Sequence, residues 1–104
     1  MIIVNTDSVP DRDIVAVHGL VMGNTIRSKN VGKDIGAGLK NLVGGELRSY
    51  TAMITEARQE ALDRMVESAA SMNANAVVIV SFTTSQIAGG AAELLAFGTA
   101  VTLS

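Results

Sequence analysis

The stretch LRSYTAMITEARQEALDRMVESAASM (residues 47–72) has the clearest secondary-structure pattern in the chain. Its apolar residues recur at three- and four-residue spacing, which predicts an amphipathic helix with one continuous apolar stripe. The other side is charged, and Glu60 and Arg64 stand in the favourable i, i+4 order. We therefore expect one long helix that packs across the rest of the domain. The stripe consists of Leu47, Tyr50, Ile54, Ala57, Ala61, Met65, Ala69 and Met72, widened by Leu62 and Val66.

Three strands are predicted around this helix. Residues 14–21 are apolar or small on both faces apart from His18, which is typical of a strand covered on both sides. Residues 76–84 and 92–103 alternate in the manner of strands, and the turn at 86–90 between them predicts a hairpin. One face of the last strand carries small residues and suits a helix lying closely over it. That face consists of Ala92, Leu94, Ala96, Gly98, Ala100 and Thr102.

A glycine-rich segment, VGKDIGAGLKNLVGG (residues 31–45), precedes the long helix. Its apolar spacing predicts a short helix at 31–42, although each glycine inside a helix costs roughly 0.8–1 kcal/mol relative to alanine. We expect Gly36 and Gly38 to permit close approach of another backbone at a subunit contact. Gly44 and Gly45 are expected to end the helix and reverse the chain.

The same segment resembles a phosphate-binding loop only superficially. A Walker loop requires glycine where Arg27 stands and Ser or Thr where Asp34 stands, and a dinucleotide fingerprint requires glycine where Asn41 stands. An anion site where Lys33 or Lys40 meets a helix N-terminus stays open. We therefore expect the glycines to serve packing and assembly rather than nucleotide binding.

Together these elements predict a single α+β domain over residues 1–104. The order is β-α-α-β-β, with an antiparallel sheet and one long helix packed across it. Residues 2–4 add a further short strand. The sheet face away from the helix then needs cover, and another subunit is the expected source.

Composition points the same way. The chain is 48% hydrophobic and only 17% charged, against roughly 25% charged residues in ordinary soluble domains. The longest apolar runs, 76–80 and 91–97, are far shorter than the ~20 residues that a spanning helix needs. Residues 1–13 do not have the pattern of a signal peptide. We therefore expect a cytoplasmic homo-oligomer that buries its second apolar surface against copies of itself.

The residue inventory disfavours several kinds of chemistry. The chain has no cysteine, so it has no disulfide, thiolate nucleophile or iron–sulfur cluster. A net charge of −2 and only three aromatic residues argue against nucleic-acid binding. We expect no enzyme and no catalytic residues, because His18 is the one base available to the serines. The enzymatic alternative is a cleft between subunits that holds Asp34, Glu46 and Tyr50.

Several separated blocks resemble one protein family. The chain is similar to the YbjQ family of uncharacterised proteins, which carries a heavy-metal-binding label. The resemblance implies a dodecin-like β-α-β-β subunit and a homopentamer. Asn73 departs from a frequent family glycine but suits the same backbone role. The blocks are GLVMG (19–23), DIGAGLKNLVGG (34–45), Tyr50 with EARQEA (56–61), NAVV (75–78) and GTAV (98–101).

The metal ion that the label implies has few candidate ligands. A soft-metal site uses cysteine or clustered histidine and methionine, and this chain has a single histidine. Five copies of His18 around a ring axis are one arrangement. Glu56 and Glu60, one helical turn apart, are another, for a hard cation. The alternatives are that His18 is a core or interface residue and that the glutamates form a solvated helix face.

Two functional hypotheses follow. The first is a homo-oligomer, with a pentamer favoured, that binds a small ligand or a metal ion at its subunit interfaces. The second is a non-catalytic scaffold that binds another protein. A metal or organic mass retained through purification would distinguish them. The candidate ligand and interface residues are Asp34, Gly36, Gly38, Gly44, Gly45 and Tyr50.

Overall fold

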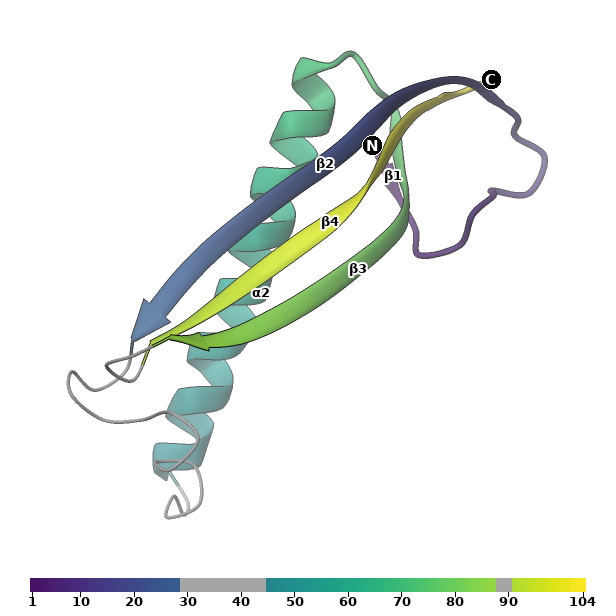
Figure 1. Cartoon of the computed structure of the whole chain (residues 1–104). Helices are drawn as coiled ribbons and strands as arrows, with labels where there is room; N and C mark the ends of the chain where they lie inside the picture. Colours follow the sequence, from purple (N-terminus) through teal and green to yellow (C-terminus); the bar gives the residue numbers. More distant parts are fainter. Residues whose placement is uncertain (29–44, 88–90) are drawn as a thin grey trace.

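The computed structural model describes residues 1–28, 45–87 and 91–104 of the chain. These residues form a two-layer α+β structure, with one long helix lying along a four-stranded sheet of order β1-β3-β4-β2 (Figure 1). The short helix predicted at 31–42 lies outside the described residues. The elements are β1 (Ile2–Ile3), β2 (Ile14–Ser28), α2 (Gly45–Ser71), β3 (Ala76–Ile87) and β4 (Ala91–Leu103).

The sheet is mixed, so the prediction of a purely antiparallel sheet is wrong. β4 pairs antiparallel with both β2 and β3, and β3 and β4 form the predicted hairpin. β1 instead runs parallel to β3, with Ile2 opposite Ala76. A parallel pair needs a connection of a dozen or more residues, and here β2 and α2 lie between the two strands in sequence.

The long helix begins and ends close to its predicted bounds. Gly45, which was expected to reverse the chain, is instead the first residue of α2. At the other end Asn73 has a φ of 64°, which confirms the predicted left-handed residue after the helix. The Ala74 N–H donates to the Ala69 carbonyl at 3.2 Å and closes the last turn. None of the described helices has the length and hydropathy needed to cross a membrane.

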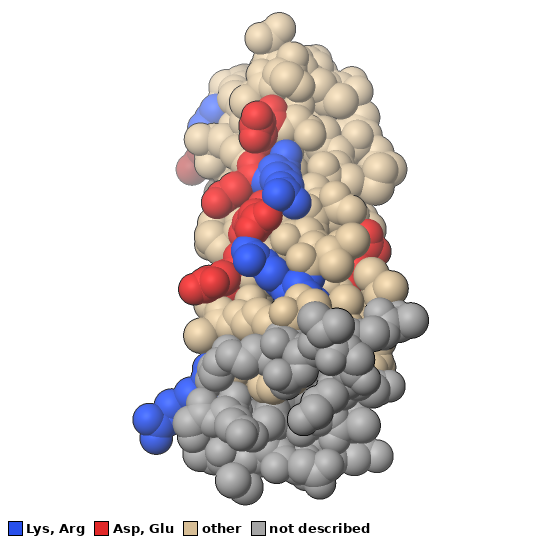
Figure 2. Space-filling model, turned by 90° about the vertical axis from the view of Figure 1, so that its left-hand side faces the viewer, with Lys and Arg blue, Asp and Glu red and all other residues tan. Residues whose placement is uncertain are grey.

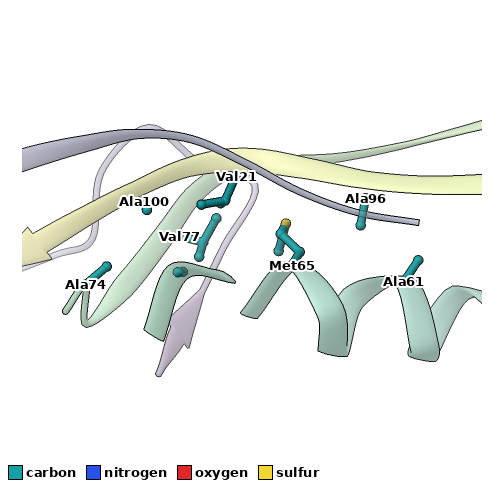
Figure 3. Close-up of a cluster of buried hydrophobic side chains, with 8 residues drawn as sticks. Val21, Ala61, Met65, Ala74, Val77, Ala96 and Ala100 are labelled. Atoms are coloured by element: carbon teal, nitrogen blue, oxygen red, sulfur yellow. The ribbon is translucent and has the colours of Figure 1, made fainter. Parts of the chain in front are cut away.

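The core lies between α2 and the small-residue face of β4. Met65 fills its centre, next to Val21 of β2 and Val77 of β3 (Figure 3). The prediction that a helix lies closely over the small face of β4 is confirmed, because these residues are buried beneath α2. The buried small residues are Ala57, Ala61 and Ala69 of α2 and Ala92, Ala96 and Ala100 of β4.

The N-terminal segment builds a second, smaller core on the opposite face of the sheet. Ile2, Val4 and Val9 pack there against the buried cluster of Ala76, Val78, Val101 and Leu103. The segment is fastened to the end of the chain, since the Ser104 N–H donates to the Asp13 carbonyl at 2.8 Å. This cover reaches only the part of the sheet near the two termini.

β2 differs most from its prediction. It continues to Ser28 instead of ending at residue 21, because its pairing with β4 continues to Ser28 opposite Ala91. It was expected to be covered on both sides, yet in the single chain it is an edge strand whose early residues Val15 and Val17 are exposed. Two irregularities, one between Ile14 and Ala16 and one between Val17 and Gly19, interrupt its pairing with β4.

Candidate functional site

β2 exposes several large apolar side chains along one strand. Six of its large apolar side chains are 40–67% exposed. The strand has β4 on one side only, so its outer edge pairs with no other strand of the described residues. A long apolar edge strand is a site where another chain can add. The six residues are Ile14, Val15, Val17, Leu20, Met22 and Ile26.

Part of this apolar surface continues across the sheet. Met22 lies opposite Phe97 of β4, and Asn24 lies opposite Leu95, so these side chains share the face away from α2. We call this surface the open sheet face. Its apolar members are Leu20, Met22 and Ile26 from β2, Leu95 and Phe97 from β4, and Ile87 from β3. The N-terminal segment covers the other end of the same face, where Val101 and Leu103 are buried.

A second apolar surface lies on the helix side of the sheet, between α2 and β3. Leu62 and Val66 form a partly buried row on α2 and pack against the main core. Phe82 lies opposite Ala96, which is buried beneath α2, so its ring points to the helix side while staying 45% exposed. Ile54 lies eight residues before Leu62 in the same row of α2. We call the apolar surface formed by Ile54, Leu62, Val66 and Phe82 the α2–β3 flank. It differs in residues and shape from the open sheet face.

The other flank of α2 is polar and is fastened to β2 through Glu60. Arg27 of β2 pairs with Glu60 Oε2, and Arg64 Nη2 pairs with Glu60 Oε1 at 2.6 Å. The buried hydroxyl of Thr25 donates to Glu60 Oε1 at 3.3 Å. We call these residues, with Asn24, the Glu60 network. Figure 2 shows a central band of acidic and basic side chains with uncharged surface beside it, and a few further charged side chains at the edges of the view.

The network reaches through the edge strand to the open sheet face. Arg64 Nη1 donates to the Asn24 carbonyl at 2.5 Å, and the Asn24 side-chain amide donates to Glu93 Oε2 at 3.1 Å. Glu93 follows Ala92 on β4 and belongs to the face away from α2. One chain of contacts therefore links the outer side of α2, the edge strand and the uncovered face.

Within one chain His18 lies apart from the glutamate pair, Glu56 and Glu60. His18 lies near the start of β2, where its Nε2 is 2.7 Å from Thr102 Oγ1. Glu60 contacts Thr25 and Arg27 near the other end of that strand, and Glu56 is exposed on α2. The described residues contain no group of three or more His, Asp or Glu placed to hold one ion.

The predicted ligand and interface residues fall into two groups. Asp34, Gly36, Gly38 and Gly44 lie outside the described residues. Tyr50 is described and is 3% exposed, in a small core cluster with Met53 and Ala92. Within one chain Tyr50 is therefore a core residue rather than a residue lining a cleft.

Sequence reasoning missed Arg27 and Thr25. The Glu60–Arg64 pair is visible in the sequence because the two residues are one helical turn apart. Arg27 lies 33 residues from Glu60, and no periodicity relates positions at that separation. Only the pairing of α2 with the edge strand brings it into contact.

Comparison with known proteins decides the family. The sequence model of the YbjQ family, described as "Putative heavy-metal-binding", matches residues 1–104. The chain belongs to this family. A UPF0145 protein of Archaeoglobus fulgidus is 58% identical over 103 residues, covering 99% of this chain and 95% of the relative. A UPF0145 protein of Vibrio campbellii is 54% identical, covering 99% of each chain.

A solved structure shares the fold of this YbjQ family member. It is a crystal structure of a protein of unknown function, of the DUF74 family, from Pediococcus pentosaceus. The TM-score is 0.68 at 12% sequence identity, and the match covers 100% of this chain and 98% of the other. At this identity the likeness shows the α+β fold alone.

Proposed function

We propose that this chain is a non-catalytic subunit of a homo-oligomer whose working sites lie at the contacts between copies. The observation that carries the proposal is β2, an edge strand with six large apolar side chains 40–67% exposed. Isolated apolar residues on a surface are ordinary, but a contiguous apolar edge is typical of an interface. Burying this strand against another copy removes both its apolar side chains and its unpaired backbone groups from water.

The arrangement favours a closed ring over a two-fold dimer. The open sheet face and the α2–β3 flank are two different apolar surfaces on different sides of the sheet. Packing one surface of a copy against the other surface of the next is a heterologous contact, and such contacts form a ring when the rotation between copies closes. The resemblance to the YbjQ family, which implies a homopentamer, supports five copies.

The ligand proposed for this ring is a small, largely apolar molecule held between copies. The open sheet face combines apolar side chains with the hydroxyl-bearing residues Ser81, Thr83 and Thr99, which the strand pairing places on the same face. Small-molecule sites are mostly apolar with a few polar groups that fix orientation. Because the chain has one histidine and no cysteine, we propose binding without catalysis. The net charge of −2 disfavours nucleic acid as a partner. The location that we propose is the cytoplasm.

Native mass spectrometry of untagged protein, purified without chelator, tests the proposal. We expect pentamers for the wild type and a shift to monomers for Met22→Glu, because the substitution places a charge in the centre of the open sheet face. Thr55→Glu is the matched control, since it adds the same charge at an exposed position of α2 and should leave the assembly unchanged. A wild-type monomer would refute the assembly, and a dimer would refute the ring.

A scaffold that binds another protein is the second function considered. Met22 lies exposed on the open sheet face, and methionine is frequent on surfaces that adapt to several partners. The same mass spectra separate the two functions. A retained organic mass supports a ligand site between copies, whereas a bare ring supports the scaffold.

A further inference from the structure

We infer that this chain has no resident heavy-metal ion, because its soft donors are few and the described His, Asp and Glu residues form no cluster that could hold one. The description of its family implies such an ion. The residues of this chain do not fit it, and the carboxylate of Glu60 instead fastens α2 to the edge strand. The inference concerns the donor chemistry of the chain, and the metal analysis below counts an ion held within one chain as well as one shared between copies.

Soft donors are scarce in the whole sequence. Heavy metals favour thiolate, thioether and imidazole ligands, and the chain has no cysteine, one histidine and five methionines. Met65 is completely buried in the main core, so its sulfur is closed to an incoming ion, and Met53 is partly buried beside Tyr50. Met1, Met22 and Met72 are exposed. The residues outside the described part, 29–44 and 88–90, include no histidine, cysteine or methionine.

One nitrogen of the single imidazole already has a partner. His18 Nε2 is hydrogen-bonded to Thr102 Oγ1 at 2.7 Å. Met22, an exposed methionine of the same strand, lies four residues further along β2, and a strand rises about 3.3 Å per residue. The two side chains therefore cannot reach one ion, since metal–ligand bonds are only about 2.0–2.3 Å long.

The carboxylate of Glu60 is occupied on both oxygens. Oε1 accepts from Arg64 and Thr25, and Oε2 accepts from Arg27. A divalent cation at either oxygen would lie beside two guanidinium groups, and the like charges would repel it. Arginine stays protonated throughout the accessible pH range, so neither group can withdraw its charge to admit the ion.

The Glu60 network cross-links the helix to the sheet. It joins α2 to the edge strand next to Gly23, where the helix backbone lies against β2. A cross-link of this kind by ion pairs needs no cofactor. Glu60 is therefore a positioning residue for the helix, and its loss should change stability without changing metal content.

Metal analysis of the intact protein tests the inference. Untagged protein is dialysed against Zn²⁺, Cd²⁺, Cu²⁺ or, under reducing conditions, Cu⁺, then against metal-free buffer, and retained metal is measured by inductively coupled plasma mass spectrometry. We expect less than one ion per assembly for every metal, and no rise in thermal midpoint on adding them. One ion per chain or one per ring would overturn the inference, whichever residues hold it.

Variants separate the two roles of the polar residues. Glu60→Gln should lower the urea midpoint, with a smaller loss at high salt because salt screens ion pairs, while metal content stays unchanged. Glu56→Gln, at an exposed position one turn away, is the matched control and should change neither. Loss of bound metal in Glu60→Gln or His18→Ala would overturn the inference. Native mass spectra of the same samples report the oligomer separately, so the two proposals can fail independently.

Discussion

At Gly23 the backbone of α2 comes very close to the sheet. A Cβ at this position would lie 2.3 Å from the Ala61 carbonyl oxygen and 2.3 Å from the Met65 nitrogen. Both are backbone atoms, so the helix as a whole would have to move. We expect Gly23→Ala to lower the free energy of unfolding by about 3 kcal/mol, at the upper end of the usual cost of overpacking, as measured by urea unfolding.

Gly19 provides the comparison for Gly23. No atom lies within 4 Å of its would-be Cβ, but its φ of +123° is one that other residues rarely adopt. Gly19→Ala should therefore cost about 1–3 kcal/mol through backbone strain alone. If Gly23→Ala proved the milder of the two, close helix approach would not be the reason for that glycine.

Ile79 is a strained residue on the surface. It has a φ of 55° in the irregular stretch between Val78 and Ser81, and its side chain is 51% exposed. The bonds from its own N–H to the Thr6 carbonyl at 3.0 Å and from the Val80 N–H to the Val4 carbonyl at 3.1 Å hold this conformation. Left-handed backbone costs an L-residue roughly 1–2 kcal/mol.

Replacing Ile79 by a residue that tolerates this conformation should release the strain. We expect Ile79→Asn to raise the free energy of unfolding by about 0.5–1 kcal/mol, since asparagine visits the left-handed region routinely. Ile79→Val keeps the branched side chain and is the control, with no gain expected. A loss of stability in Ile79→Asn, at a fixed protein concentration, would mean that its side chain contributes more than the strain costs.

At the scale of elements, the two faces of β4 have different tolerances. Ala96 is completely buried beneath α2, whereas Thr99 is half-buried on the opposite face. Added volume at Ala96 must push the helix away from the sheet. We expect Ala96→Val to lower the free energy of unfolding by about 1–3 kcal/mol, and Thr99→Val to change it by no more than about 0.5 kcal/mol. Equal effects in urea unfolding would show that α2 does not press on β4.

β2 extends to Ser28, beyond its predicted end at residue 21. Met22-Gly23-Asn24 has the composition of a turn, yet each residue pairs with β4, opposite Phe97, Ala96 and Leu95. Gly23 leaves room for the helix backbone where α2 crosses the strand. Asn24 accepts from Arg64 through its carbonyl and donates to Glu93 through its side-chain amide. Residues that favour turns stand in this strand for reasons that belong to other elements.

At the scale of the whole molecule, the exposed apolar surface should couple stability to assembly. If copies bury β2 and the open sheet face against each other, mass action stabilises the folded chain, and the thermal midpoint rises with protein concentration. We expect this rise for the wild type in differential scanning calorimetry. Leu20→Lys should abolish the concentration dependence, because it places a charge on the same surface. A midpoint independent of concentration in the wild type would refute the coupling.

Much of the fold could be predicted from local patterns. The period of residues 47–72 predicted α2, the alternation in residues 76–103 predicted the hairpin, and the small residues of β4 predicted the face that the helix covers. The parallel placement of β1 could not be predicted, because two residues carry too little pattern to choose a partner or a direction. The same limit applied to the candidate site, where residue type and helical spacing suggested His18, Glu56 and Glu60 but could not show which partners Glu60 binds.

Periodicity and composition are properties of neighbouring residues, so they were enough to predict the kind of elements, their order and the excess of apolar surface. Which strand is the exposed edge, which face stays open and what Glu60 binds depend instead on how the elements pack. Arg27 and Glu60 meet because α2 crosses β2 at Gly23, and Ile79 is strained because the N-terminal segment bonds to its backbone. Contacts between residues far apart in the chain depend on how elements pack, and no local pattern contains that information.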